Sequence, residues 1–278
     1  MVTRREWWRQ AAARLQAAGC EDAAFDARCL LEDLGGLPRG QAPDDAPLPD
    51  KVLEQLTAAL ERRAAGYPLQ YLLGEWEFLT LTLSVGEGVL IPRPDTEVLC
   101  EEVARRLGPA PQVLDLCAGS GCVGLGLASL RPDAVVTAVE LSADALPYLR
   151  QNIARYPSLQ VTAVSGDVLT DAARFDGEYD AIVSNPPYIP TARVDTLQRE
   201  VQWEPRMALD GDEDGLRFYR VIADVWSRKL RCGGLCAVEV GIGQASAVAA
   251  LFTAAGLTQV QRIRDLGGVE RVVLGIRK

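Results

Sequence analysis

The sequence contains no histidine among its 278 residues. This absence excludes Ser-His-Asp and Cys-His nucleophile pairs, zinc sites with histidine ligands and proton shuttling by imidazole. No uninterrupted run reaches about 18 apolar residues, so no transmembrane helix is predicted. The seven cysteines are scattered and include no Cys-x-x-Cys pair, which favours reduced thiols in a cytoplasmic protein. We expect a protein away from the membrane whose chemistry uses neither imidazole nor a bound metal.

Basic residues are also scarce relative to acidic ones. Lys and Arg number 29 against 38 Asp and Glu, which gives a formal net charge of −9. A chain with this charge repels a polyanion unless its basic residues cluster on one face, so stable binding to nucleic acid is not expected. The apolar fraction of 48% is ordinary for a globular protein, and the length suits one large domain or two moderate ones.

Residues 1–74 read as a helical N-terminal domain. Thr3 and Glu6 form a capping-box pattern, after which apolar residues recur at helical spacing. Further helices are predicted over residues 22–34 and 50–65, where glycine or proline follows the last periodic residue. Residues 75–98 are predicted as a β-hairpin linker, because alternation of period two flanks a turn at residues 86–88.

Strands and helices alternate through the remaining residues, 99–278. Strands are predicted at residues 113–116, 135–139, 160–164, 180–184, 235–240, 258–263 and 271–276. Helices are predicted near residues 121–130, 142–156, 215–230 and 245–255. Alternation of this kind predicts an α/β fold with a doubly wound, mostly parallel seven-stranded sheet.

Three successive strand ends carry residues suited to a nucleoside ligand. The first strand runs into the turn at residues 115–121, where Gly119, Gly121 and Gly124 also spell Gly-x-Gly-x-x-Gly. Glu140 closes the second strand, where a carboxylate can accept hydrogen bonds from both ribose hydroxyls, and Asp167 follows the third. Since ligands bind at the carboxyl ends of parallel strands, these features indicate a nucleoside pocket, and the glycine pattern alone would also fit a dinucleotide.

The tetrad Asn185-Pro186-Pro187-Tyr188 follows the fourth strand directly. Two prolines fix the backbone and remove two N–H donors, which leaves carbonyl groups free to accept. A carbonyl beside the Asn185 side-chain oxygen provides two acceptors for one NH2 group, and Tyr188 offers a flat face to the group that carries it. The tetrad therefore indicates a site for a planar amine or amide nitrogen.

Together these motifs resemble class I AdoMet-dependent methyltransferases, and most closely the release factor glutamine methyltransferase family. The resemblance covers nearly the whole chain. Its most specific part is residues 91–97, Ile-Pro-Arg-Pro-Asp-Thr-Glu, and other shared segments lie at residues 204–206, 214–216, 239–241 and 265–271. Two positions depart from the family pattern, because the family often has glycine at Cys117 and an aromatic residue near Val168.

The resemblance implies a set of functional residues and no metal. It places AdoMet against Asp115, Cys117, Ala118, Gly119, Ser120, Gly121, Glu140, Asp167, Val168 and Asn185. It assigns the catalytic role to Asn185, Pro186 and Tyr188, and substrate binding to Asn185, Pro186, Pro187, Tyr188 and Arg93. The implied substrate is the glutamine of a Gly-Gly-Gln loop on bacterial class I release factors, with residues 1–74 gripping the factor outside that loop.

Other interpretations of these residues remain open. A flipped adenine or guanine could present its exocyclic amine to the same tetrad, although the net charge disfavours this. An NAD-dependent oxidoreductase would explain the glycines and Glu140 but gives the tetrad no role, and a silent AdoMet-binding protein would not need it intact. Arg93 could simply pair with nearby acids, and Glu239 could cap or pair locally at its strand end.

Overall fold

The structure, a computed structural model, describes residues 1–278, which form two compact units. The first unit consists of Met1–Gly74 and Gln198–Trp203, and the second of Glu75–Leu197 and Glu204–Lys278. The chain therefore leaves the second unit for six residues in its middle and contributes them to the helical one. None of its helices combines the length and apolar character needed to cross a membrane.

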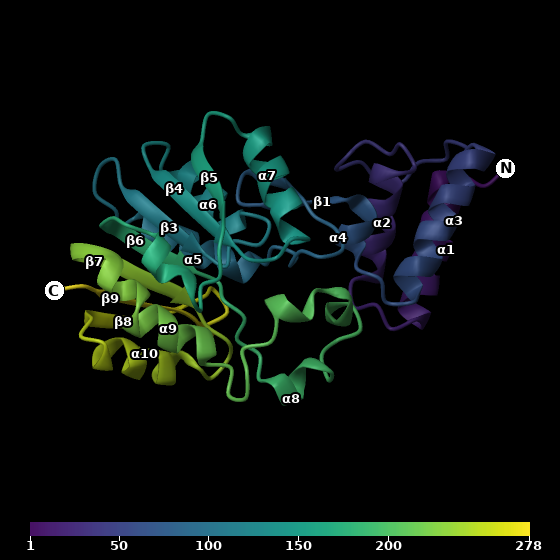
Figure 1. The fold of residues 1–278 in the computed structure, drawn as a ribbon. Helices are drawn as coiled ribbons and strands as arrows, with labels where there is room; N and C mark the ends of the chain where they lie inside the picture. The colour runs from purple at the N-terminus through teal and green to yellow at the C-terminus, as the bar shows by residue number, and fades with distance from the viewer. The chain divides into compact units, whose positions relative to one another are not determined.

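The first unit is helical, as predicted. It contains α1 (Arg4–Ala17), α2 (Ala23–Asp33), α3 (Asp50–Ala64) and the short α4 (Leu69–Leu73). The capping box is present at the start of α1: the Thr3 side chain accepts from the Glu6 N–H, and the Glu6 carboxylate accepts from the Thr3 N–H. The three longer helices pack against one another (Figure 1) and bury one apolar face of each.

A buried ion-pair cluster joins the chain segments of this unit. The Arg63 guanidinium on α3 lies 2.7 Å from the Asp26 carboxylate on α2 and 2.9 Å from the Glu200 carboxylate. Burial raises the pKa of Asp26, while Arg63 opposes that rise. Because a charge left unpaired in such a place costs several kcal/mol, on the order of 3 to 5, residues 198–203 are an integral part of the helical unit.

The second unit is built on a seven-stranded sheet with the order β5-β4-β3-β6-β7-β9-β8. Its strands are β3 (Gln112–Leu116), β4 (Val135–Glu140), β5 (Gln160–Ser165), β6 (Tyr179–Ser184), β7 (Leu230–Glu239), β8 (Thr258–Arg264) and β9 (Glu270–Ile276). The first five are parallel, and β9 runs antiparallel to both β7 and β8. The predicted α/β fold with a mostly parallel sheet is confirmed.

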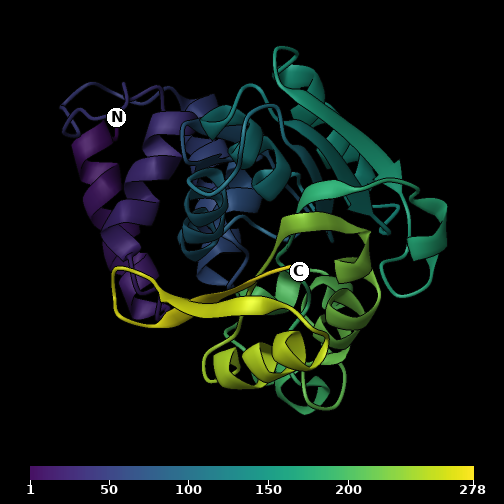
Figure 2. The same cartoon turned by 90° about the vertical axis from the view of Figure 1, so that its left-hand side faces the viewer.

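Helices cover both faces of this sheet, as Figures 1 and 2 show. On one face lie α5 (Pro94–Ala104), α6 (Cys122–Leu130) and α7 (Ala145–Arg155). On the other lie α9 (Arg217–Asp224) and α10 (Ala245–Ala254), the latter beside the C-terminal hairpin drawn in yellow. Alternate residues of each strand enter the two apolar cores, so near-continuous apolar strands follow from burial on both sides.

The β-hairpin has a different position from the one predicted. Its strands are β1 (Glu75–Phe78) and β2 (Leu81–Ser84), so the turn lies at Leu79 and Thr80 rather than at residues 86–88. Leu79 has a φ of 52°, and a turn residue with positive φ is usually predicted from glycine or asparagine, not from leucine. Residues 89–91 form no strand. The predicted turn glycine Gly86 instead packs closely on α7, where a Cβ would lie 2.2 Å from the Tyr148 hydroxyl oxygen.

Two predicted helices are shorter than expected. The helix predicted over residues 142–156 is α7, which begins at Ala145 because Ser142 and the residues after it form the turn from β4. The helix predicted over residues 215–230 is divided into α9 and a 3-10 turn, Trp226–Lys229. In that turn the buried Trp226 indole N–H donates to the Val168 carbonyl, which draws the chain out of helical continuation.

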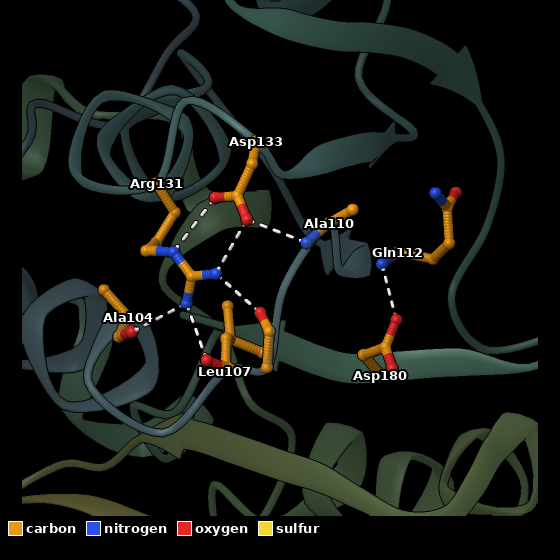
Figure 3. A network of polar contacts seen from close by, with 8 residues as sticks. Ala104, Leu107, Ala110, Gln112, Arg131, Asp133 and Asp180 are labelled. Atoms are coloured by element: carbon orange, nitrogen blue, oxygen red, sulfur yellow. Dashed lines mark hydrogen bonds and ion pairs between the residues drawn. The ribbon is translucent and has the colours of Figure 1, made fainter.

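At the amino ends of the strands, Arg131 joins the connection between α6 and β4 to the connection between α5 and β3 (Figure 3). Its guanidinium donates to the carbonyls of Ala104 and Leu107 and pairs with Asp133, whose carboxylate also accepts from the Ala110 N–H. These hydrogen bonds lower the pKa of Asp133 to about 2. Arg131 thereby caps the carboxyl end of α5 and fixes the approach to β3.

Candidate active site

A cavity opens at the carboxyl ends of the parallel strands in the second unit. Its walls are the turns after β3, β4, β5 and β6, together with residues 88–93 and residues 205–208. The predicted residues that line it are Arg93, Cys117, Ala118, Gly119, Ser120, Glu140, Asp167, Val168, Asn185 and Pro187. Four predicted residues, Asp115, Gly121, Pro186 and Tyr188, do not line the cavity.

The turn from β3 to α6 forms the floor of the cavity. Cys117, Gly119 and Gly121 all have positive φ, at 60°, 56° and 86°. Gly121 has a packing role, because a Cβ there would lie 2.6 Å from Leu149 Cδ1 on α7. Ser120 lines the cavity with its hydroxyl oxygen buried and without a hydrogen-bond partner in the chain. This hydroxyl is an exception to the rule that buried polar groups are hydrogen-bonded.

Glu140 lies at the end of β4 with its carboxylate held by the backbone. One oxygen accepts from the Gly119 N–H at 2.7 Å, and the other accepts from the Ser142 N–H at 2.7 Å. The side chain lines the cavity. Each carboxylate oxygen has a second lone-pair direction, so Glu140 can still accept two hydrogen bonds from a ligand.

Asp115 lies beneath the turn and not at the cavity surface. It is fully buried on β3, and one of its oxygens accepts from the Gly124 N–H in the first turn of α6 at 2.9 Å. Burial raises its pKa to about 8. Asp115 supports the start of α6 and does not line the cavity, so its contact with the cofactor stays a prediction.

The far end of the cavity is lined by Asp167, Val168 and Phe218. Asp167 accepts from the Leu169 N–H at 2.8 Å and is thereby fixed in a tight turn after β5. No aromatic residue neighbours Val168 in the sequence, but α9 brings Phe218 to the same cavity. A planar ring can thus meet an aromatic side chain that local sequence reasoning did not identify.

The tetrad presents two of its four residues to the cavity. Asn185 and Pro187 line it, whereas Tyr188 is turned toward the sheet, where its hydroxyl donates to Glu239 at 3.4 Å. The Tyr188 carbonyl accepts from the Gln244 side chain at 2.9 Å, and Gly215 approaches that carbonyl so closely that a Cβ would lie 2.2 Å from it. The tetrad is therefore held in place by contacts on the side away from the cavity. The Pro186 carbonyl has no hydrogen-bond partner in the chain.

Two further residues contact the tetrad and were not predicted as site residues. Thr96 on α5 accepts from the Asn185 side-chain NH2 at 3.1 Å and donates to Glu239 at 2.5 Å. Thr96 and Glu239 are both buried. One signal for Glu239 was available, since an acidic residue interrupts the apolar run at the end of β7, the strand beside the tetrad's own.

Arg93 lines the cavity and also pairs with an acid, though not with one near it in sequence. Its guanidinium contacts the buried Glu204 carboxylate, which accepts in addition from the Ile91 N–H at 3.0 Å. Burial raises the pKa of Glu204 and Arg93 lowers it. The pair fastens residues 91–93 to the segment that begins at Glu204, so Arg93 shapes the cavity wall.

The chain is similar to known proteins over most of its length. Residues 6–74 match the model described as PrmC N-terminal domain, and residues 94–203 match the methyltransferase small domain. A release factor glutamine methyltransferase of Caulobacter vibrioides is 40% identical over 97% of this chain and 95% of its own. One of Geobacter sulfurreducens is 42% identical over 94% of this chain and 92% of its own.

A solved methyltransferase of Pyrococcus furiosus shares the fold, with a TM-score of 0.54 and 18% identity over 72% of this chain and 90% of its own. The two sequence relatives are similar to this chain over nearly their whole length. The chain belongs to the release factor glutamine methyltransferase family.

Proposed function

We propose that this protein transfers a methyl group from AdoMet to the side-chain amide nitrogen of a glutamine in a peptide chain release factor. The observation that carries this proposal is the Asn185 side chain at the cavity wall, followed by a proline whose carbonyl is unpartnered. Two acceptors at this place suit an NH2 group, and an amide NH2 is the group that a glutamine offers.

The cavity residues fit AdoMet in their chemistry. Glu140 would accept from the two ribose hydroxyls, Ser120 would pair its unpartnered hydroxyl with a polar group, and Val168 and Phe218 would contact the adenine. When bound, AdoMet supplies a methyl group on a positively charged sulfur. The cavity's acidic Glu140 and Asp167 favour a ligand with that charge.

The tetrad's contribution is orientation. An amide nitrogen is a weak nucleophile because its lone pair is shared with the carbonyl. Acceptance of both N–H hydrogens, by the Asn185 Oδ1 and the Pro186 carbonyl, would aim the lone pair at the methyl carbon and stabilise the positive charge that develops on nitrogen. A nitrogen–carbon bond forms, the carbon–sulfur bond breaks, and the nitrogen then loses a proton to water. No imidazole base is required, in agreement with a chain that contains no histidine.

We also propose that the helical unit binds the release factor outside the methylated loop. A cavity that holds one side chain cannot distinguish a glutamine of one protein from that of another, so selectivity needs a second surface. The chain commits residues 1–74 to a separate unit that contributes nothing to the cavity lining, which supports this division of roles.

The test is to follow the methyl group. Purified protein is incubated with methyl-labelled AdoMet and either an intact bacterial class I release factor or total RNA. We expect label in the release factor alone, on a single glutamine identified by mass spectrometry of its peptides. Label on RNA, or on a release factor residue other than glutamine, would contradict the proposal.

A further inference from the structure

We propose that Thr96 and Glu239 are positioning residues that set the orientation of the Asn185 side-chain amide, so that its oxygen and not its NH2 faces the substrate nitrogen. The inference rests on the proposed function and explains why the Asn185 side-chain oxygen is the atom that is available to accept from the substrate. An asparagine side chain can present either end, and only the oxygen can accept from a glutamine NH2. The orientation of Asn185 therefore decides whether the site works.

Three side chains from three elements form a continuous chain of hydrogen bonds. The Asn185 Nδ2 lies 3.1 Å from Thr96 Oγ1, and Thr96 Oγ1 lies 2.5 Å from a Glu239 carboxylate oxygen. Asn185 follows β6, Glu239 ends β7, and these strands are paired with Ser184 opposite Val238. Thr96 enters from the first turn of α5, which packs on β7.

The number of hydrogen atoms available in this series of hydrogen bonds fixes which group donates and which accepts in each of them. A carboxylate only accepts, so the single hydroxyl proton of Thr96 is donated to Glu239. The Thr96 oxygen is then left with lone pairs alone and can only accept from its other neighbour. Asn185 must therefore turn its NH2 toward Thr96, which leaves its Oδ1, without any partner in the chain, for the cavity.

Burial makes this arrangement rigid. Thr96 is 0% exposed and Glu239 1% exposed, so water cannot replace either partner. The other carboxylate oxygen of Glu239 accepts from the Tyr188 hydroxyl at 3.4 Å, so one acid anchors both ends of the tetrad. Turning Asn185 over would face its oxygen to the Thr96 lone pairs, and two acceptors without a proton between them repel.

The arrangement depends on the charge of Glu239. Its pKa is raised to about 7, chiefly by burial; Asp95 adds to the rise, while Arg271 and the Thr96 and Tyr188 hydroxyls oppose it. The titratable or charged groups around it are Asp95 and Cys100 on α5, Cys122 on α6, Tyr188, Tyr219 on α9 and Arg271 on β9. Once protonated, Glu239 can donate to Thr96, which frees the Thr96 proton for Asn185 Oδ1 and removes the constraint.

The experiment compares Thr96→Val with Thr96→Ser in the full-length protein. Valine keeps the shape of threonine but removes the hydroxyl, while serine keeps the hydroxyl. Turnover is measured with a release factor and AdoMet, and AdoMet affinity is measured separately by calorimetry. For Thr96→Val we expect kcat to fall by ~10- to 100-fold, since an acceptor lost at a buried polar contact costs on the order of 1 to 3 kcal/mol. AdoMet Kd should change less than about threefold, and Thr96→Ser should recover most of the lost turnover.

The pH dependence of kcat distinguishes the positioning role from a packing role, because a residue that only packs would not change it. In the wild type, kcat should rise as pH rises through about 7, where Glu239 ionises. In Thr96→Val this rise should disappear, because no hydroxyl remains to transmit the charge of Glu239 to Asn185.

The possible outcomes separate this inference from the proposed function. Thr96→Val with wild-type kcat and an unchanged pH profile overturns the positioning role while leaving glutamine methylation intact. Loss of turnover in both Thr96→Val and Thr96→Ser, with correct folding and AdoMet binding, also overturns it, since the hydroxyl would then not be the decisive group. A wild type that methylates no glutamine refutes the proposed function itself.

Discussion

Three acidic residues near the cavity, each on a strand of the same sheet, have different roles because their surroundings differ. Glu140 keeps lone pairs available at the cavity while backbone N–H groups hold its carboxylate. Asp115 is enclosed, and burial raises its pKa to about 8. Glu239 is also enclosed but accepts from two hydroxyl groups. Of these acids only Glu140 was identified from its position at a strand end, whereas Asp115 came from the family resemblance and Glu239 was expected to cap or pair locally. The packing around each carboxyl is what distinguishes ligand contact from structural support.

Glu140→Ala should weaken AdoMet binding. The variant loses the acceptor for the ribose hydroxyls and also the contacts that hold the Gly119 and Ser142 N–H groups. Hydrogen bonds to a charged group contribute about 1.5 to 3 kcal/mol each, so affinity should fall ~10-fold or more. Calorimetry measures this, with Asp144→Ala as a control that removes an exposed carboxylate from the following turn. Equal affinity in Glu140→Ala and the control would remove the ribose assignment.

Asp115→Asn should flatten the pH dependence of stability. The folded-state pKa of about 8 lies above the ordinary value, so the folded protein retains a proton that the unfolded chain releases. The favourable contribution of this carboxyl is complete below pH ~4 and is lost as pH rises to about 8, at up to ~1.4 kcal/mol per pH unit. Asparagine keeps an oxygen for the Gly124 N–H but has no proton to release. Urea unfolding between pH 5 and 8 measures the difference, and parallel curves for the two proteins would argue against a neutral Asp115.

At the scale of elements, the sequence was most informative where a pattern repeats. Alternating apolar strands and helices predicted the α/β sheet, and four of the five parallel strands agree with their expected ranges within one residue at each end. The fifth, β7, begins at Leu230 and not at the expected Leu235. The hairpin was misplaced, because its turn at Leu79 and Thr80 carries no glycine or asparagine. The Thr96 contact to Asn185 was also beyond reach, since it joins residues 89 positions apart through packing of α5 on the sheet. Contacts between distant elements depend on the packed fold and leave no local pattern.

Arg131→Ala should destabilise the second unit without affecting its cavity. The variant leaves the carbonyls of Ala104 and Leu107 without their donor and removes the partner of Asp133 (Figure 3). We expect Tm to fall by about 2 to 8 °C, because two carbonyls lose their donor and a partly exposed polar network is broken. Arg228→Ala is the matched control, because Arg228 is exposed and its side chain pairs only with Asp224. A fall no larger than that of the control would mean that the network contributes little.

For the whole molecule, the proposed function assigns chemistry to the second unit and recognition to the first. The cavity belongs entirely to the second unit, while the first is a helical unit closed by the Arg63 ion-pair cluster. Since Glu200 completes that cluster, removal of residues 1–74 would leave residues 198–203 without their partners. Point substitutions on the helical unit are therefore better suited than truncation to test its role.

Phe25→Ser should weaken recognition of intact release factor selectively. Phe25 on α2 is 53% exposed, so the substitution removes an apolar contact surface at little cost to the core. We expect KM for the intact factor to rise ~3- to 10-fold, as for loss of a moderate interface contact, with KM for a short loop peptide unchanged. Leu130→Ser, which alters an exposed residue of α6 in the second unit, is the control. Equal KM values for the intact factor in all three proteins would indicate that this face of α2 takes no part in docking.

Asn185→Ala removes the side chain that we propose directs a glutamine nitrogen toward the methyl group. Calorimetry first establishes AdoMet affinity, which we expect within about threefold of the wild type because Glu140 and the β3–α6 turn are unaltered. Single-turnover methylation of an intact release factor is then followed by mass spectrometry. We expect a loss of ~100-fold or more in the methylation rate, in the range for removing a group that orients the reacting atoms. A variant that binds AdoMet and methylates the glutamine at a near-normal rate would contradict this role of Asn185.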